Sequence, residues 1–118
     1  MKNNVYTVTQ INNYIKLVLE DDVLLNPIYI EGEISNLKKH TSGHIYFTLK
    51  DEDCSINCIM YKQDAQNLTQ DLNDGLKIIC CGNVSSYIKT GQYQLYVKNI
   101  KNSGAGNVFL DFEKLLLK

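Results

Sequence analysis

The stretch GEISNLKKHTSGHIYFTLKD, residues 32–51, is the most informative part of the chain, because it joins two β patterns through a basic turn that contains glycine. Its segment 36–50 holds three lysines and two histidines and no acidic residue. The whole chain of 118 residues nevertheless has a formal net charge of only −1. Positive charge is therefore concentrated locally, and we interpret this stretch as a hairpin that binds nucleic acid.

Alternation sorts the residues of the hairpin into two faces, since successive side chains of a strand point to opposite sides of a sheet. The set expected in the core is apolar and comprises Ile34, Ile45, Phe47 and Leu49. The set expected on the outer face is polar, aromatic or basic and comprises His44, Tyr46, Thr48 and Lys50. Gly32, inside the first strand, predicts a bulge or a sharp bend.

The same reasoning extends to the rest of the chain. Helical spacing predicts an opening helix at 7–25 that stops before Pro27, and a short helix at 63–72 that ends near Gly75 as its cap. Period-two alternation predicts five strands, at 28–37, 44–50, 56–61, 77–87 and 92–100. A helix between the third and fourth of five strands is the order of an OB-fold. We therefore expect a mainly β protein, a five-stranded OB-fold barrel with flanking helices.

The length of the chain predicts a single domain. Residues 1–103 are expected to form the OB-fold nucleic-acid-binding domain, including the opening helix. Residues 104–118 are expected to be a glycine-containing linker and the start of a C-terminal helix, whose apolar residues are Phe109, Phe112, Leu115 and Leu116. Because nothing downstream in the chain covers that apolar stripe, we expect it to lead into a further domain that the chain does not contain. The alternative is that the stripe packs on the barrel or on a second copy of the chain.

The sequence lacks the patterns of the common catalytic sites. His40 and His44 have no serine or cysteine nearby in a nucleophile setting. Glu31 and Glu33 share a strand face and are better explained as a polar surface than as an acid–base pair. There is no phosphate-binding loop with its lysine and hydroxyl residue. We therefore predict no catalytic residue and no cofactor in this chain.

The four cysteines are predicted to be buried thiols, and no metal site is expected. Cys54 and Cys58 lie at either end of one predicted strand, roughly 13 Å apart at 3.3 Å per residue, which is too far for one tetrahedral ion. Cys80 and Cys81 are adjacent in a strand and point to opposite faces. No segment has the length of a secretory signal or of a membrane span, so we expect a cytoplasmic protein with no membrane partner and no disulfide.

In OB-folds, the outer faces of the second and third strands and the loops beside them form an oligonucleotide groove. The residues that map to this groove are Lys38, Lys39, His44, Tyr46, Thr48, Lys50, Asn57, Tyr61 and Lys89. Tyrosine rings stack on bases for roughly 1–3 kcal/mol each and lysines neutralise phosphates, so this face suits single-stranded nucleic acid. The chain has no arginine, which disfavours base-specific recognition.

Three of these assignments have alternatives. Tyr46 could complete the core or form a cross-strand aromatic pair instead of stacking on a base. Tyr61 closes a strand and could equally cap the barrel. The lysines in the loops could simply be solvated, and only their clustering beside the groove distinguishes them.

Several segments of the chain together form a recognisable motif. They are residues 32–36, 42–44 and 46–51 of the hairpin, then Tyr87 and GQYQL at 91–95. This motif resembles the N-terminal domain of the large subunit of exodeoxyribonuclease VII. The resemblance covers nearly the whole chain. In that family the N-terminal domain is an OB-fold that holds single-stranded DNA.

The resemblance implies a module that holds single-stranded DNA while a downstream catalytic domain hydrolyses it to oligonucleotides. It also implies a small-subunit partner that binds the C-terminal part of the parent protein. Both parts are expected outside this chain, so no catalytic residue is transferred to it. The alternative is an OB-fold that binds tRNA or another protein and has no link to a nuclease.

Overall fold

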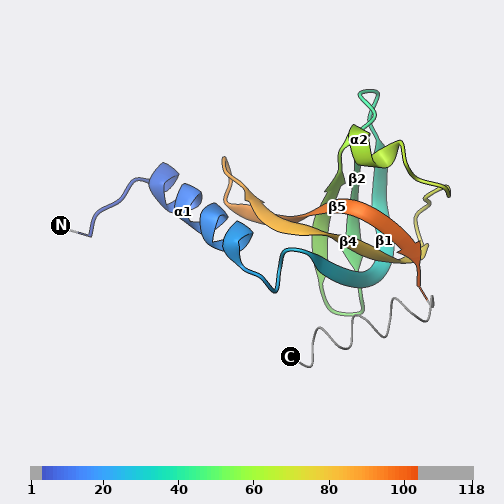
Figure 1. The fold of residues 1–118 in the computed structure, drawn as a ribbon, viewed down its shortest axis with the longest axis horizontal. Helices are drawn as coiled ribbons and strands as arrows, with labels where there is room; N and C mark the ends of the chain where they lie inside the picture. The colour runs from blue at the N-terminus through green and yellow to red at the C-terminus, as the bar shows by residue number, and fades with distance from the viewer. Residues whose placement is uncertain (1–3, 104–118) are drawn as a thin grey trace.

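The computed structural model describes residues 4–103, which form a closed five-stranded barrel with a long helix at its side (Figure 1). The elements in chain order are α1 (Val8–Asp21), β1 (Ile28–Lys39), β2 (Ile45–Lys50), β3 (Ser55–Met60), α2 (Lys62–Ala65), β4 (Lys77–Tyr87) and β5 (Gln92–Asn102). The predicted OB-fold class is confirmed. The C-terminal helix expected within 104–118 lies outside the described residues.

The order of the strands around the barrel is β1-β2-β3-β5-β4, and β4 pairs with β1 to close it. Neighbouring strands are antiparallel except β3 and β5, which run parallel at Cys58↔Leu95 and Ile59↔Tyr96. Closure pairs every strand on both sides, so the barrel has no free sheet edge. A second consequence is that β5 lies beside β3, and the outer face of β3 continues onto β5.

Apolar side chains from all five strands fill the barrel. The four core residues predicted from the hairpin are all buried there: Ile34, Ile45, Phe47 and Leu49. Each fully buried side chain of this size contributes about 1.5–3 kcal/mol of transfer free energy. Alternation in the hairpin therefore identified the core correctly.

The cysteines divide according to their position in the barrel. Cys58 and Cys80 lie in the core, where burial raises the pKa of the Cys58 thiol to about 12 and raises that of Cys80 as well. Cys81 is half-buried and Cys54 is exposed, so the prediction of four buried thiols is wrong for Cys54. The reason is that Cys54 precedes β3 and lies in the turn after β2, outside the alternating part of the strand.

The bulge predicted in β1 lies at a different residue. The register of β1 with β2 shifts between Ser35 and Lys38, around Asn36, whose φ is +54°. Gly32 is instead a point of close packing, because a Cβ at that position would lie 2.8 Å from Cγ of Leu49. The bulge interrupts the pairing of β1 with β2, between residues 33–35 on one side and Lys38 and Lys39 on the other, and the pairing with β4 ends before it, at Glu33.

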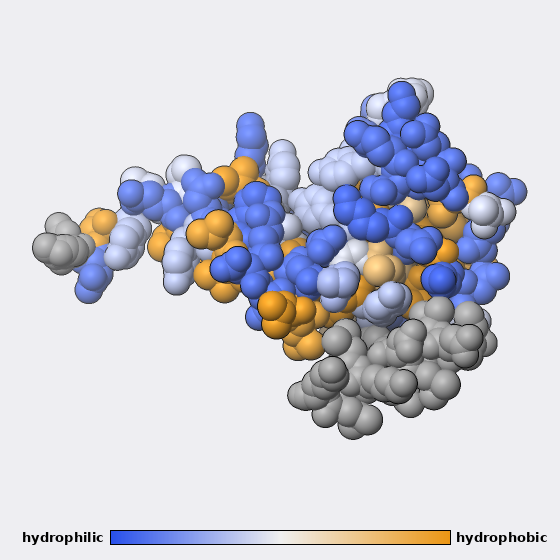
Figure 2. All heavy atoms as spheres, in the orientation of Figure 1, coloured by the Kyte–Doolittle hydropathy of each residue, from blue (hydrophilic) through white to orange (hydrophobic). Residues whose placement is uncertain are grey.

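The N-cap of α1 is Thr7. A capping box fixes this end, since the Gln10 N–H donates to Thr7 Oγ1 at 3.0 Å and the Thr7 N–H donates to Gln10 Oε1 at 2.9 Å. Figure 2 shows hydrophobic residues along α1 and the segment after it, beside a more hydrophilic barrel surface. Within residues 4–103, no helix combines the length and apolarity that a membrane span requires.

α1 ends at Asp21, earlier than the predicted end at Leu25. Two polar side chains stop it by replacing helical hydrogen bonds. The Asp22 carboxylate accepts the N–H of Leu25 at 3.2 Å, and the Asn26 amide donates to the carbonyl of Leu19 at 2.6 Å. Side chains of this kind compete with the backbone and favour helix ends, so the stop precedes the proline.

α2 spans only Lys62–Ala65, much less than the helix predicted at 63–72. The last residue of β3 pairs with the first residue of β2. The first residue of β4 pairs with Glu33, and Glu33 pairs with Lys50 at the other end of β2. β3 therefore ends at one end of the barrel and β4 begins at the other. The connecting chain must run the length of the barrel. An extended segment covers about 3.3 Å per residue and a helix only about 1.5 Å, so the extended form is needed. The predicted cap at Gly75 is also wrong, because Gly75, with φ +89°, lies in the turn before β4.

Candidate nucleic-acid interface

The outer faces of β2, β3 and β5 form one continuous surface. Tyr46 of β2 lies across from Ile59 of β3, which lies across from Tyr96 of β5. On its other side, Tyr46 is in register with Lys38 of β1. Tyr46 keeps 40% of its surface exposed, while Ile59, flanked by the two tyrosines, keeps 8%. Tyr46 is thus not a core residue, and neither of its register partners is aromatic.

Aromatic rings on this surface form two groups. Tyr46 contacts His40 with a centroid distance of 6.5 Å and an interplanar angle of 77°. Tyr61 lies between His44, at 5.3 Å and 78°, and Tyr96, at 5.9 Å and 31°. These edge-on and tilted contacts position the rings without stacking them face to face. Since Tyr61 also keeps 38% of its surface exposed, both Tyr46 and Tyr61 offer ring surface to a ligand.

His44 also has a structural role. Its Nδ1 accepts the backbone N–H of Lys62, the first residue of α2, at 2.9 Å. The N-cap residue Tyr61 makes no side-chain cap of its own, so His44 satisfies this end of the helix. The bond requires an unprotonated Nδ1 and fixes the place of Tyr61 relative to β2.

The loop between β1 and β2 is a tight basic turn. The Gly43 N–H donates to the carbonyl of His40 at 2.9 Å, and the φ of Gly43 is +100°, which side chains disfavour. The loop follows Lys38 and Lys39, the last residues of β1. The side chain of Lys62 packs against it, since a Cβ on Gly43 would lie 3.0 Å from Cγ of Lys62. Lys62 adds a cation that the sequence analysis missed, because only the fold brings α2 to this loop.

Four of the predicted residues meet in one shallow depression between β1, β2, β3 and β5. Thr48 and Asn57 pair across β2 and β3. Together with Lys38, Tyr46 and Gln94 they line a hollow of about 230 Å³. This hollow contains a ring, a cation and hydrogen-bonding groups at one place, which is the combination that a nucleotide needs.

Two predicted lysines lie elsewhere. Lys50 is in register with Glu33 and lines a separate hollow that also contains Glu31 and Glu52. Lys89 lies in the turn between β4 and β5, which Figure 1 shows beside α1 and away from the β1–β2 loop. The β1–β2 loop is therefore the basic end of the surface, and the Lys50 end is acidic.

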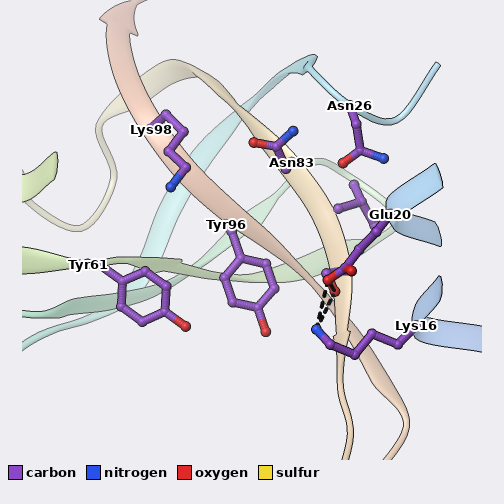
Figure 3. A pocket seen from close by; sticks show the side chains of 9 residues that line it. Lys16, Glu20, Asn26, Tyr61, Asn83, Tyr96 and Lys98 are labelled. Atoms are coloured by element: carbon purple, nitrogen blue, oxygen red, sulfur yellow. Dashed lines mark hydrogen bonds and ion pairs between the residues drawn. The ribbon is translucent and has the colours of Figure 1, made fainter. Parts of the chain in front are cut away.

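A larger hollow, of about 440 Å³, lies between α1 and the outer face of β4 and β5 (Figure 3). Its main polar and aromatic lining residues are Lys16, Glu20, Tyr61, Asn83, Tyr96 and Lys98. Tyr96 and Lys98 are not among the site residues predicted from the sequence. Alternation in β5 was the signal that could have found them, because Leu95 and Val97 are buried and their neighbours must point outward.

Polar bonds hold α1 against the barrel and so build this hollow. The Glu20 carboxylate accepts the Ser85 hydroxyl at 2.6 Å and the Lys16 ammonium at 2.8 Å. Both bonds lower the pKa of Glu20 below its ordinary value, and the bond from Lys16 has the larger effect. Nearer the N-terminus, Asn12 Nδ2 donates to the carbonyl of Ile88 at 2.8 Å. The helix is thereby fixed along the β4–β5 hairpin.

Metal ligation is the remaining chemistry to consider. Within residues 4–103, no group of three or more His, Cys, Asp or Glu side chains is arranged to hold a metal ion. The side chains that gather on the β2–β3–β5 face are instead phenols, amides, hydroxyls and ammonium groups. Such groups bind a ligand by stacking, hydrogen bonding and charge.

Comparison with known proteins gives one matching family and a set of close relatives. Residues 6–101 match the model of the OB-fold nucleic acid binding domain. The exodeoxyribonuclease 7 large subunit of Clostridium botulinum strain Okra is 53% identical over 109 residues, or 92% of this chain and 27% of the relative. The large subunit of Clostridium perfringens strain SM101 is 48% identical over 115 residues, or 98% and 29%. The chain thus spans less than a third of the length of these curated relatives.

Solved structures share the fold at low sequence identity. A replication protein A heterotrimer bound to single-stranded DNA matches with a TM-score of 0.57 and 9% identity, over 77% of this chain and 68% of that chain. The second single-stranded DNA binding protein of Mycobacterium smegmatis matches with a TM-score of 0.55 and 12% identity, over 66% and 86%. At such identities the likeness concerns the barrel alone.

Proposed function

Because this chain belongs to the family of OB-fold nucleic acid binding domains, we propose that it is the single-stranded DNA-binding domain of an exodeoxyribonuclease VII large subunit. The clostridial relatives support the assignment to this nuclease, since their identity to the chain is about half over nearly all of it. The barrels of the two single-stranded DNA-binding proteins support the type of ligand.

The observation that carries the proposal is the exposed tyrosine surface beside a loop of unpaired lysines. Tyr46 lies in one hollow with Lys38, and Lys39 follows at the same loop. The ion pairs within residues 4–103 join two residues of α1 to each other and β5 to α2, and neither uses these two lysines. Their ammonium groups are therefore available to phosphates, while the tyrosine ring takes a base without reading its identity.

In this proposal the chain holds substrate and performs no chemistry itself. Hydrolysis of the DNA to oligonucleotides belongs to the remaining length of the parent protein, as does contact with a small subunit. The groove consists of Lys38, Lys39, His44, Tyr46, Thr48, Asn57 and Tyr61, with Lys62 added. Lys50 and Lys89 contribute at a distance from that centre. The parent protein acts on DNA in the cytoplasm.

Fluorescence anisotropy of a labelled oligo-dT with the 118-residue chain tests this proposal. We expect salt-sensitive binding, with each neutralised phosphate adding about 0.7 to the slope of log K against log salt. Tyr46→Ala is expected to weaken binding about tenfold, by removing one stack of roughly 1–3 kcal/mol. Replacing both Lys38 and Lys39 with Gln is expected to lower the salt slope by about 1.4.

The matched control is Tyr14→Ala, which removes an exposed tyrosine from α1. It is expected to bind as the unchanged chain does. Equal affinity for duplex and single strand, or affinity that salt leaves unchanged, contradicts the proposal. Tight binding of tRNA with no binding of oligo-dT would favour the alternative assignment.

A further inference from the structure

The hollow beside α1 continues the aromatic surface of the groove. Tyr61 belongs to both, because it contacts His44 at the start of β2 and also lines the hollow with Tyr96. We propose that this hollow, termed the α1 cleft, binds one nucleobase of the strand as it leaves the β2–β3 groove. The inference rests on the proposed function, since it takes the ligand to be single-stranded DNA.

The two tyrosines supply the stacking surface. Figure 3 shows Tyr61 and Tyr96 next to each other on the barrel side of the cleft, with Lys16 and Glu20 entering from α1. The rings are 5.9 Å apart and inclined by 31°, so neither stacks fully on the other. Burial, and then the neighbouring Tyr61, raises the pKa of Tyr96, which keeps its hydroxyl neutral and able to donate.

The charges of the cleft favour a neutral base over a phosphate in its interior. Lys16 and Glu20 neutralise each other at 2.8 Å on the helix side. Lys98 is paired more loosely, at 3.5 Å from Asp64, and about half of its side chain is exposed. A phosphate can compete with Asp64 for Lys98 because that pair is long and exposed. The base therefore enters the cleft while the backbone passes over Lys98.

Asn83 gives the cleft a hydrogen-bonding group for the edge of the base. It lies on β4 in register with Tyr96 and lines the same hollow. Its side chain makes no hydrogen bond to another residue within 4–103. A side-chain amide both donates and accepts, so it can pair with any of the four bases. The volume of about 440 Å³ also falls in the range of small-ligand pockets.

α1 is required for this site, since it forms one wall. The wall is held by three bonds: the Ser85 hydroxyl donates to Glu20, Lys16 donates to Ser85, and Asn12 donates to the β4–β5 turn. A barrel without α1 would keep the β2–β3 groove and lose the cleft. The helix therefore extends the binding surface of the barrel beyond β2 and β3.

Photocrosslinking and affinity measurements on the 118-residue chain test the proposal. Oligo-dT with a single 5-iodouracil at successive positions is irradiated, and the crosslinked peptide is identified by mass spectrometry. We expect some positions to crosslink to Tyr46 and others, displaced along the strand, to crosslink to Tyr96. Tyr96→Leu is expected to weaken binding of long oligonucleotides about tenfold, and Tyr96→Phe to stay within about twofold of the unchanged chain.

The controls separate this inference from the proposed function. Tyr14→Leu removes a tyrosine from the face of α1 that points away from the barrel and is expected to change nothing. If Tyr46→Ala weakens binding while Tyr96→Leu behaves as Tyr14→Leu does, and all crosslinks stay on β2 and β3, the cleft is excluded and the proposed function stands. If the unchanged chain binds no single strand, both fall. Should Tyr96→Leu fail to fold, the crosslinks of the unchanged chain decide alone.

Discussion

The barrel is held mainly by apolar burial, whereas α1 is held by one partly buried leucine and several polar contacts. The barrel buries a continuous apolar core from five strands. α1 buries no residue fully, and Val8, Ile11, Ile15 and Val18 of its apolar stripe are exposed. The side that faces the barrel carries Leu19, which packs partly buried against the core, and the polar residues Asn12, Lys16 and Glu20, whose bonds reach the β4–β5 hairpin.

A periodic pattern therefore predicts an element without predicting which face of it docks. In the barrel, the apolar face of each strand and the buried face are the same. In α1 they coincide only at Leu19, since most of the apolar stripe is exposed and polar side chains make the hydrogen bonds to the barrel. A helix held by a few partly exposed hydrogen bonds of about 1 kcal/mol each can detach more easily than a strand can leave the core.

The largest expected effect tests the core side of this comparison. Leu95 has 0% of its surface exposed, so Leu95→Ala should lower the free energy of unfolding by about 2–5 kcal/mol through lost burial and a cavity. Ile15, on α1, is 43% exposed, so Ile15→Ala should change the free energy of unfolding by no more than about 0.5 kcal/mol. Urea unfolding followed by circular dichroism measures both. Equal losses would show that α1 belongs to the cooperative core.

A smaller effect is expected at the polar attachment of α1. Asn12→Ala removes the bond to the carbonyl of Ile88 and should destabilise docking of the helix by about 1 kcal/mol. Hydrogen exchange of α1 amides should then accelerate roughly fivefold while exchange in β4 and β5 stays constant. Asn13→Ala, on an exposed position of the same helix, is the control. Faster exchange throughout the barrel would contradict separate stabilities.

The smallest expected effect is the pH dependence at Glu20. Hydrogen bonds from Lys16 and Ser85 lower the pKa of Glu20 from 4.5. Its contribution to stability is therefore complete above pH 4.5 and is lost as the pH falls through the lowered pKa. Because the pair is solvent-exposed, we expect less than about 1 kcal/mol. NMR shifts of the Ser85 amide against pH should report the loss. With Glu20→Gln, the Ser85 amide shift should not change with pH over this range. A titration midpoint above 4.5 in the unchanged chain would show that the pKa of Glu20 is raised instead of lowered.

The candidate site could be read from the sequence only where strand alternation governs it. Alternation placed Tyr46 and Thr48 on the outer face, and the structure brings both to one hollow with Asn57. It could not show that Lys50 lies opposite Glu33, because register depends on the bulge in β1. Lys62 was missed because it reaches the β1–β2 loop only through the fold.

Local sequence patterns were enough to predict the five strands, their inward faces and the basic turn, because a period of two and the chemistry of a glycine turn are local properties of the chain. The tertiary structure alone decided that β5 pairs with β3, which brings Tyr96 across from Ile59 and beside Tyr61. It also decided that α1 docks through Leu19 and a few polar side chains while most of its apolar stripe stays exposed. Both depend on how distant segments close around one core, and no local pattern encodes that closure.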